Sequence, residues 1–394
     1  MHFCQTTHPI TKFGTLTIFI KSVPAVAKKQ KRRYSIGFAK GMAMNIDVKK
    51  LQSLLDDAVS SGLECGCQLA IYYKGELVAD LCAGYTAPDQ KTPVKPDSLF
   101  PVFSVGKAMF SAAIHRLVEK GTLSYSTRIA DVWPEYGCNG KENTLLWHVM
   151  SHRSAMSQMP DVPLDEVADW DLMCERIAQM APAWKPGTKC SYQPYSFAWL
   201  LGEPAVRADG RPLQQILQDE IIGPLDLENE MFFGISDEAM SRFVPLDSSG
   251  SYNDCVEKSN HPALQKACIP SFNGIMSARA IAKFYTALDA EMGGVQLLKT
   301  ETVENAAIPR RAADDPLDPA CIWPRFGLGF VTGGTDGIYA GIMGHGGAVG
   351  AEGLIDRKNH LALGFTRNRI DPRHPNHPLR DLISEELNLP IRHW

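Results

Sequence analysis

Ser104 and Lys107 are the first residues in this sequence whose types and spacing could do chemistry. They stand three positions apart where a helix is expected to begin, so both side chains would project from the same side of that helix. A serine hydroxyl becomes a nucleophile when a base takes its proton, and a buried lysine that has lost its own proton can be that base. The pattern is weak alone, because the serine could simply cap the helix and the lysine could be solvated.

Two later segments could complete such a site. Tyr192 follows a Pro-Gly turn, and its hydroxyl would matter if the fold brought it to Ser104, where a neighbouring cation could hold it as phenolate. The glycine-rich run 344–350 follows a β-rich stretch, which fits an edge strand that lines a cleft and presents amides to a substrate. Val349 stands where a G-x-G-x-x-G motif needs its third glycine, so we do not expect a dinucleotide site.

Other catalytic and metal-binding patterns are missing from the sequence. The residues before Ser104 lack the first glycine of G-x-S-x-G, no H-E-x-x-H occurs, and the His and Cys spacings give no ligand set, so neither metal nor cofactor is expected. His345 alone could be a structural histidine. His152 and Arg153 are interpreted as local hydrogen-bonding anchors, and Ser277 as a helix N-cap.

Composition gives a globular protein with ordinary proportions. The 394 residues are 44% hydrophobic with a net charge of −4, which gives no reason to expect a nucleic-acid or membrane partner, and no run of 18 apolar residues occurs. Ten cysteines are scattered without a C-x-x-C pair. We interpret them as mostly free thiols, which favours a reducing compartment and a cytoplasmic location.

Residues 1–44 differ from the rest of the chain. An apolar stretch at 14–20 precedes the basic run at 28–33, whereas a signal peptide carries its positive charge first. We interpret residues 1–44 as a leader that is disordered or not native, and secretion is the less favoured interpretation.

The elements that must position these residues follow from periodicity and caps. Apolar spacing after Asp47 predicts a helix, and another is expected from Ser104 to Gly121. Further expectations are a β-hairpin over 67–84, a helix from Pro212 to Gly223, an irregular polar stretch over 236–270, strands at 338–343, 353–355 and 361–366, and a closing amphipathic helix. Strands near both ends with helices between predict one sheet formed by both termini and a helical insertion.

Three segments in order resemble the serine β-lactamase and penicillin-binding-protein superfamily, in its class C-like branch with the family VIII carboxylesterases. Ser104-Val105-Gly106-Lys107 is similar to its S-x-x-K, Tyr192-Gln193-Pro194 to its Y-x-N, and His345-Gly346-Gly347 to its K-T-G. The resemblance extends over residues 47–390. Three ordered motifs are a strong signal where any single one is weak.

The resemblance implies an α/β fold of the α+β type, with an antiparallel sheet flanked by helices and a mostly helical inserted domain. It divides the catalytic region 45–394 into sheet-containing parts at 45–100 and 271–394 and a mainly helical part at 101–270. It also implies acyl transfer through a covalent acyl-enzyme.

On this sequence, Ser104 would attack the carbonyl while Lys107 and Tyr192 relay its proton. The backbone amides of Ser104 and Ala348 would form the oxyanion hole, and His345, Gly346 and Gly347 would contact the substrate.

Two departures from the family pattern bear on the substrate. Pro194 replaces the asparagine of Y-x-N, and His345 replaces the lysine of K-T-G, so an amide and a fixed positive charge that suit β-lactams are missing. The expected substrate is therefore a small, fairly neutral carboxylic ester. Alternatives are a β-lactamase, a D-amino-acid peptidase or an acyltransferase of the same fold, and, in a different class, a non-catalytic scaffold or binding protein.

Overall fold

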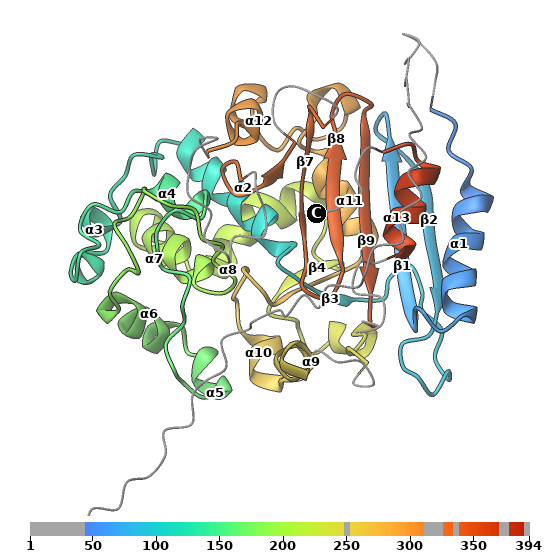
Figure 1. Ribbon diagram of the computed structural model, residues 1–394, viewed down its shortest axis with the longest axis horizontal. Helices are drawn as coiled ribbons and strands as arrows, with labels where there is room; N and C mark the ends of the chain where they lie inside the picture. The colour runs from blue at the N-terminus through green and yellow to red at the C-terminus, as the bar shows by residue number, and fades with distance from the viewer. Residues whose placement is uncertain (1–43, 248–252, 311–325, 334–338, 370–377, 390–394) are drawn as a thin grey trace, which may run out of the picture. The chain divides into compact units, whose positions relative to one another are not determined.

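A six-stranded antiparallel sheet is built from strands near both ends of the chain. The computed structural model describes residues 44–247, 253–310, 326–333, 339–369 and 378–389, so the predicted leader, apart from Met44, lies outside the described residues. The sheet has the order β2-β1-β9-β8-β7-β6 (Figure 1). Its strands are β1 (Gly66–Tyr73), β2 (Glu76–Gly84), β6 (Val331–Thr332), β7 (Ile342–Gly346), β8 (Glu352–Asp356) and β9 (Leu361–Arg367).

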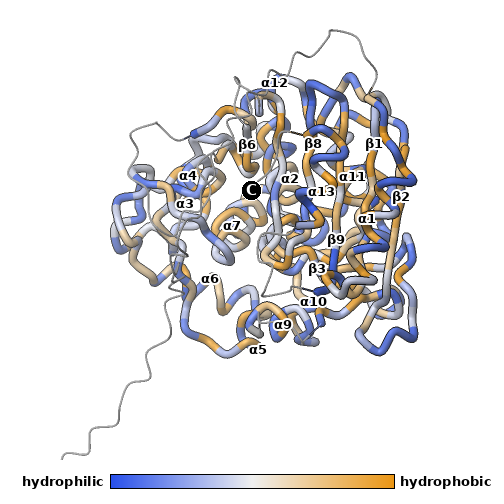
Figure 2. The backbone as a smooth tube through the Cα atoms, turned by 45° about the vertical axis from the view of Figure 1, so that its right-hand side comes forward, coloured by the Kyte–Doolittle hydropathy of each residue, from blue (hydrophilic) through white to orange (hydrophobic). Residues whose placement is uncertain are grey.

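Helices cover both faces of this sheet because its strands alternate apolar side chains between the two faces. Leu69 and Ile71 of β1 pack in one cluster with residues of α1 (Val48–Ser60) and α13 (Pro378–Glu386). Ala70, between them, packs instead against α11 (Ala278–Thr286). The hydropathy colouring of Figure 2 shows apolar residues recurring along these strands and helices. The predicted antiparallel sheet flanked by helices is confirmed.

The close approach of α11 depends on glycines in the strands. A Cβ at Gly364 of β9 would lie 2.1 Å from the carbonyl oxygen of Ala278, and one at Gly353 of β8 would lie 2.3 Å from the ring of Tyr285. Helix α11 begins at the predicted cap, where the Ser277 side chain accepts a hydrogen bond from the Ala280 amide.

A second, smaller sheet carries the start of the candidate site. It joins β3 (Phe100–Phe103), β5 (Gly274–Met276) and β4 (Met231–Phe233) in that order. The sequence did not reveal it, because strands of three or four residues are too short to show alternation.

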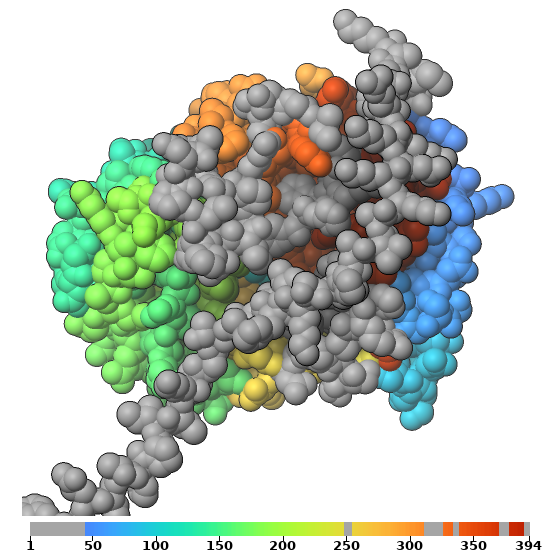
Figure 3. Space-filling model, in the orientation of Figure 1, coloured from blue at the N-terminus to red at the C-terminus, as the bar shows by residue number. Residues whose placement is uncertain are grey.

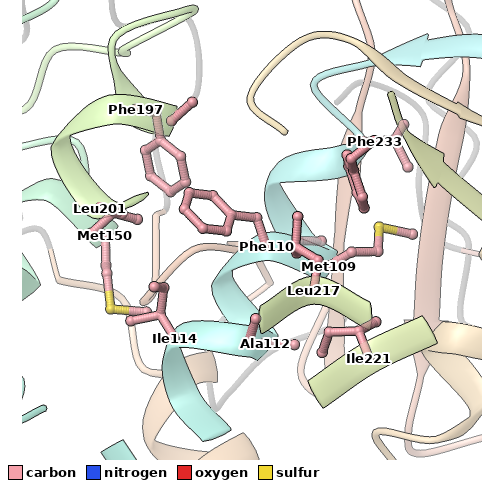
Figure 4. Packing of buried hydrophobic residues seen from close by; sticks show 14 of the residues in the cluster. Met109, Phe110, Ala112, Ile114, Met150, Phe197, Leu201, Leu217, Ile221 and Phe233 are labelled. Atoms are coloured by element: carbon pink, nitrogen blue, oxygen red, sulfur yellow. The ribbon is translucent and has the colours of Figure 1, made fainter. Parts of the chain in front are cut away.

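Helix α2 (Gly106–Glu119) is buried nearly all round, with eleven of its fourteen residues inside. Figure 4 shows Phe110 and Ile114 of α2 among Met150, Phe197 and Leu201. In Figure 3 the green residues, around 130–210, gather on the side opposite the blue residues of the described N-terminal part. The helices and turns between β3 and α11 are α3 (Ile129–Val132), η1 (Pro134–Tyr136), α4 (Leu146–Met150), α5 (Leu164–Val167), α6 (Trp170–Gln179), α7 (Phe197–Asp209), α8 (Leu213–Leu217), η2 (Gln218–Ile222), η3 (Gly223–Leu225), η4 (Ala239–Arg242), α9 (Asn253–Asn260) and α10 (Pro262–Lys266); η5 (Ala290–Met292) and α12 (Thr300–Ala307) follow α11.

Two predicted elements differ in detail. The helix expected from Pro212 to Gly223 is an α-helix only over α8, and it continues as a π-turn, η2, that turns the Glu220 side chain inward. The stretch 236–270, expected to be irregular, contains η4, α9 and α10. Mostly polar residues make up α9, so its sequence carried little apolar periodicity.

The eight cysteines within the described ranges are all free, as the sequence predicts. No helix in that part of the chain is long and apolar enough to span a membrane. The division into sheet-containing and helical parts and the cytoplasmic location stay predictions.

Candidate active site

Ser104 lies in the turn between β3 and α2, where the backbone is tightly constrained. Phe103, just before it, has φ +50°, a left-handed conformation that costs a non-glycine residue about 1–2 kcal/mol. Gly106, just after it, has no room for a side chain, since a Cβ there would lie 2.6 Å from the Pro270 carbonyl oxygen. The N-cap of α2 is Val105, without a side-chain hydrogen bond, so Ser104 does not cap the helix.

Lys107 is fully buried and points at Ser104. Its Nζ lies 3.0 Å from Ser104 Oγ, 2.7 Å from the Pro194 carbonyl oxygen and 2.6 Å from the Ser271 carbonyl oxygen. Burial lowers the pKa of Lys107 well below its ordinary value. A neutral amine has two N–H bonds for the two carbonyls, which leaves its lone pair for the Ser104 hydroxyl. The geometry therefore suits a base rather than a solvated cation.

Tyr192 meets the same two residues. Lys107 Nζ lies 5.2 Å from the centroid of its ring. Burial raises the pKa of Tyr192 above its ordinary value, although a hydrogen bond with the Ser104 side chain acts in the opposite direction. Tyr192 is therefore a neutral phenol, and the expectation that a cation holds it as phenolate is not supported.

The third motif lies at the end of β7, beside this group. The rings of His345 and Tyr192 are 6.1 Å apart between centroids. His345 Nδ1 lies 2.8 Å from the Gly346 carbonyl oxygen, which can only accept, so Nδ1 carries the proton. Burial is the main cause that lowers the pKa of His345 to about 3. The position therefore holds a neutral side chain where the family pattern has a cation.

The glycines after His345 bring this strand against the start of the first motif. A Cβ at Gly347 would lie 2.2 Å from the carbonyl oxygen of Val102, whereas one at Gly346 would have no neighbour closer than 4.0 Å. Ala348 follows and is exposed. Among the described residues, neither the Ala348 amide nor the Ser104 amide donates a hydrogen bond, so both are free to bind an oxyanion.

Sequence reasoning underestimated two contributors to the site. His152, interpreted as an anchor, does accept a hydrogen bond from the Gln193 amide, but its ring also lies 4.8 Å from that of Tyr192. The Ser271 carbonyl holds Lys107, and no pattern could have found it because every residue has a carbonyl. Arg153 is an anchor, donating to the Gly187 and Arg310 carbonyls.

Metal-ligand clusters of three or more His, Cys, Asp or Glu side chains do not occur within the part of the chain that the structure describes. The residues that the structure brings together are thus a hydroxyl, an amine, a phenol, a neutral imidazole and two free amides. This arrangement can attack a carbonyl carbon, stabilise the resulting oxyanion and move one proton.

Comparisons with known proteins agree with this geometry. A family profile described as Beta-lactamase matches residues 52–387. The chain is 28% identical over 334 residues to "Esterase/beta-lactamase LipL" from Mycobacterium tuberculosis, and the alignment covers 77% of each chain.

Solved structures show the same architecture. A family VIII carboxylesterase superposes with a TM-score of 0.77 at 24% identity, covering 88% of this chain and 98% of the other. A penicillin-binding-protein homologue from Caulobacter crescentus gives a TM-score of 0.71 at 27% identity, covering 84% of this chain and 94% of the other.

Proposed function

Because this chain belongs to the beta-lactamase family, we propose that it is a serine esterase that hydrolyses small carboxylic esters through an acyl-enzyme on Ser104. The observation that carries the proposal is the surroundings of Lys107. A buried amine whose two N–H bonds are directed to the Pro194 and Ser271 carbonyls, 3.0 Å from a serine hydroxyl, is arranged to accept that hydroxyl's proton.

In the first half of the reaction, Lys107 takes the proton from Ser104 as Oγ bonds to the ester carbonyl carbon. The carbonyl oxygen becomes an oxyanion that the free amides of Ser104 and Ala348 stabilise. Losing one such donor typically costs on the order of a hundredfold or more in rate. When the C–O bond to the alcohol breaks, Tyr192 gives its proton to the leaving alkoxide and regains one from Lys107.

The second half reverses these roles. Water replaces the alcohol and loses a proton through Tyr192 and Lys107 as its oxygen bonds to the acyl carbon. The bond to Ser104 Oγ then breaks, Oγ regains a proton, and the carboxylic acid leaves. A neutral phenol suits Tyr192 for both halves, because it can donate a proton before it accepts one.

The neutral state of His345 supports an ester rather than a carboxylate-bearing β-lactam as substrate. With its pKa lowered to about 3, His345 offers no positive charge at neutral pH to a substrate carboxylate. Gly346, with open space over its Cα, and Gly347 would let the substrate approach the strand closely. The name of LipL includes both esterase and β-lactamase activity, so β-lactam turnover is among the outcomes to test.

The test is hydrolysis of p-nitrophenyl esters from acetate to octanoate, with nitrocefin alongside. We expect turnover by the natural protein, its loss in Ser104→Ala, and a preference for short acyl chains. Ser111→Ala is the matched control, because Ser111 is a buried serine further along α2 and its Oγ has no partner in the described structure.

Other outcomes would select among the alternatives. Ester turnover that survives Ser104→Ala would remove Ser104 from the nucleophile's role. Nitrocefin turnover exceeding ester turnover would favour a β-lactamase, and faster product formation with added alcohol would favour an acyltransferase. No turnover of esters, amides or β-lactams, and no labelling of Ser104 by a fluorophosphonate, would favour a scaffold.

A further inference from the structure

His152 lies directly behind Tyr192, at the end of a short helix that has no other part in the proposed chemistry. Helix α4 ends at Met150, and the backbone just after it bonds to the loop that carries Tyr192, since the Gly187 amide donates to the Arg153 carbonyl oxygen. His152 is buried and has φ +59°, the left-handed region that non-glycine residues rarely adopt. A strained backbone held at this place needs surroundings that fix it.

Two hydrogen bonds join His152 to the residues on either side of Tyr192. The Ser191 amide donates to the His152 carbonyl oxygen over 2.8 Å. The Gln193 amide donates to His152 Nδ1 over 3.2 Å. One residue therefore fixes the backbone immediately before and immediately after the tyrosine.

The His152 ring also restricts the Tyr192 side chain. The centroid of the His152 ring lies 4.8 Å from that of Tyr192 and 4.3 Å from that of Phe326. Phe326 in turn stacks on the Tyr192 ring, with the two centroids 5.8 Å apart and an interplanar angle of 9°. Since Nδ1 accepts from an amide, it carries no proton, so the imidazole is neutral and not a second base.

We propose that His152 is a positioning residue that holds the Tyr192 hydroxyl where it can protonate the leaving alkoxide. The proposal rests on the proposed esterase mechanism and adds a role outside the three motifs. His152 acts through Tyr192, and the hydrogen bond from the Gln193 amide to Nδ1 is the contact that does the positioning.

The proposal predicts that the loss of activity on replacing His152 depends on the leaving group of the ester. An alkoxide is a poor leaving group until it is protonated, whereas p-nitrophenolate leaves without a proton. Loss of the Nδ1 acceptor should therefore impair alkyl esters far more than p-nitrophenyl esters of the same acid. Loss of folded protein would impair both equally.

The experiment measures kcat/KM, which reports acylation, for ethyl butanoate and p-nitrophenyl butanoate. His152→Phe keeps an aromatic ring without the acceptor, and His152→Asn keeps an acceptor and tolerates a positive φ. Tyr192→Phe gives the reference pattern. We expect His152→Phe to lose at least about tenfold with the ethyl ester and less than about threefold with the p-nitrophenyl ester, and His152→Asn to recover most of the loss.

Equal losses with the two esters in His152→Phe, while Tyr192→Phe discriminates between them, would overturn the positioning role. Near-natural activity with the ethyl ester in His152→Phe, together with a loss in His152→Asn, would overturn the part given to Nδ1. If His152→Phe does not fold, His152→Gly removes the same acceptor without strain at this φ and is compared with His152→Asn. Failure of the esterase proposal itself is seen separately, as absent turnover in the natural protein or turnover that survives Ser104→Ala.

Discussion

Lys107 is a cation-forming side chain buried with carbonyl groups as its partners. Its three hydrogen-bond partners are a hydroxyl and two backbone carbonyls. The family pattern has an asparagine side chain two positions after the tyrosine, and here the backbone carbonyl of Pro194 accepts a hydrogen bond from Lys107. A proline at this position therefore removes a side-chain amide without leaving the lysine short of an acceptor.

The lowered pKa of Lys107 sets an expected pH dependence. The proposed mechanism requires the neutral amine, so kcat/KM should fall as the pH drops through the Lys107 pKa, which lies well below the usual value of 10.5. The raised pKa of Tyr192 places its own ionisation above 10, and His345, with a pKa of about 3, should not titrate above pH 5. The measurement is kcat/KM for a short ester between pH 5 and pH 10. An acid limb near 10, or one near 6.5 that disappears in His345→Gln, would contradict this assignment.

At the scale of elements, a buried carboxylate ties α2 to the segment after α7. The π-turn η2 directs the Glu220 side chain inward. There it forms ion pairs with Arg116, in the last turn of α2, and with Lys120, the C-cap of α2. It also pairs with Arg211 over 2.9 Å. Lys107 lies in the first turn of α2, at its opposite end, and Ser104 lies in the turn just before the helix. The ion-pair cluster therefore fixes the far end of the helix whose N-terminus forms the site.

Glu220→Gln should lower the free energy of unfolding at pH 7 by about 1.5–3 kcal/mol, the usual worth of buried hydrogen bonds to charged groups. Burial would raise the pKa of Glu220, but hydrogen bonds from Lys120 and Arg211 outweigh it and the pKa is lowered. The carboxylate's contribution should be complete above pH about 4.3 and lost as the pH falls through the folded-state pKa. Urea unfolding at pH 7 and pH 3.5 checks both points.

Asp219→Asn is the control for this cluster, because Asp219 pairs with the same Arg211 but its side chain is 40% exposed. It should cost under about 1 kcal/mol. A Glu220→Gln variant as stable as the natural protein at pH 7, or equally destabilised at both pH values, would show that the charge on Glu220 does not stabilise the fold.

The elements also show what the sequence could and could not reveal. Ser104 and Lys107 are three residues apart where α2 begins, so their contact could be predicted from spacing alone. The resemblance that the three ordered motifs carried is confirmed. The Ser271 carbonyl and the His152 side chain reach the site from distant segments and have no local signature. The π-turn at η2 was not predicted, because apolar spacing indicates a helix but does not distinguish an α-helical from a π-helical turn.

At the scale of the whole molecule, one buried amide links segments from both ends of the chain. Gln68 of β1 donates through Nε2 to the carbonyls of Lys95, Pro96 and Ser98. Its Oε1 accepts from the Ala278 amide at the start of α11, over 2.9 Å, and from the hydroxyl of Thr366 in β9, over 3.1 Å. No local pattern in the sequence marks this residue as central.

Gln68→Leu should therefore destabilise the fold strongly, since it leaves buried backbone groups unpaired at several places. We expect a loss of about 2–4 kcal/mol in the free energy of unfolding, measured by urea titration. Gln214→Leu, at an exposed position of α8, is the matched control and should change it by less than about 0.5 kcal/mol. Equal effects of the two substitutions would show that the amide does not link the segments energetically.

The sheet order has a consequence for how the protein is made. Strand β1 pairs with β9, and 298 residues separate Gln68 from its partner Thr366. At ordinary translation rates β1 waits on the order of tens of seconds on the ribosome for β9 to be synthesised. Ser104, in the turn before α2, and Lys107, in its first turn, emerge early, whereas His345 in β7 and Ala348 just after that strand emerge much later. On the proposed mechanism, a nascent chain lacks the second oxyanion-hole amide, and therefore ester turnover, until the segment after β7 has emerged.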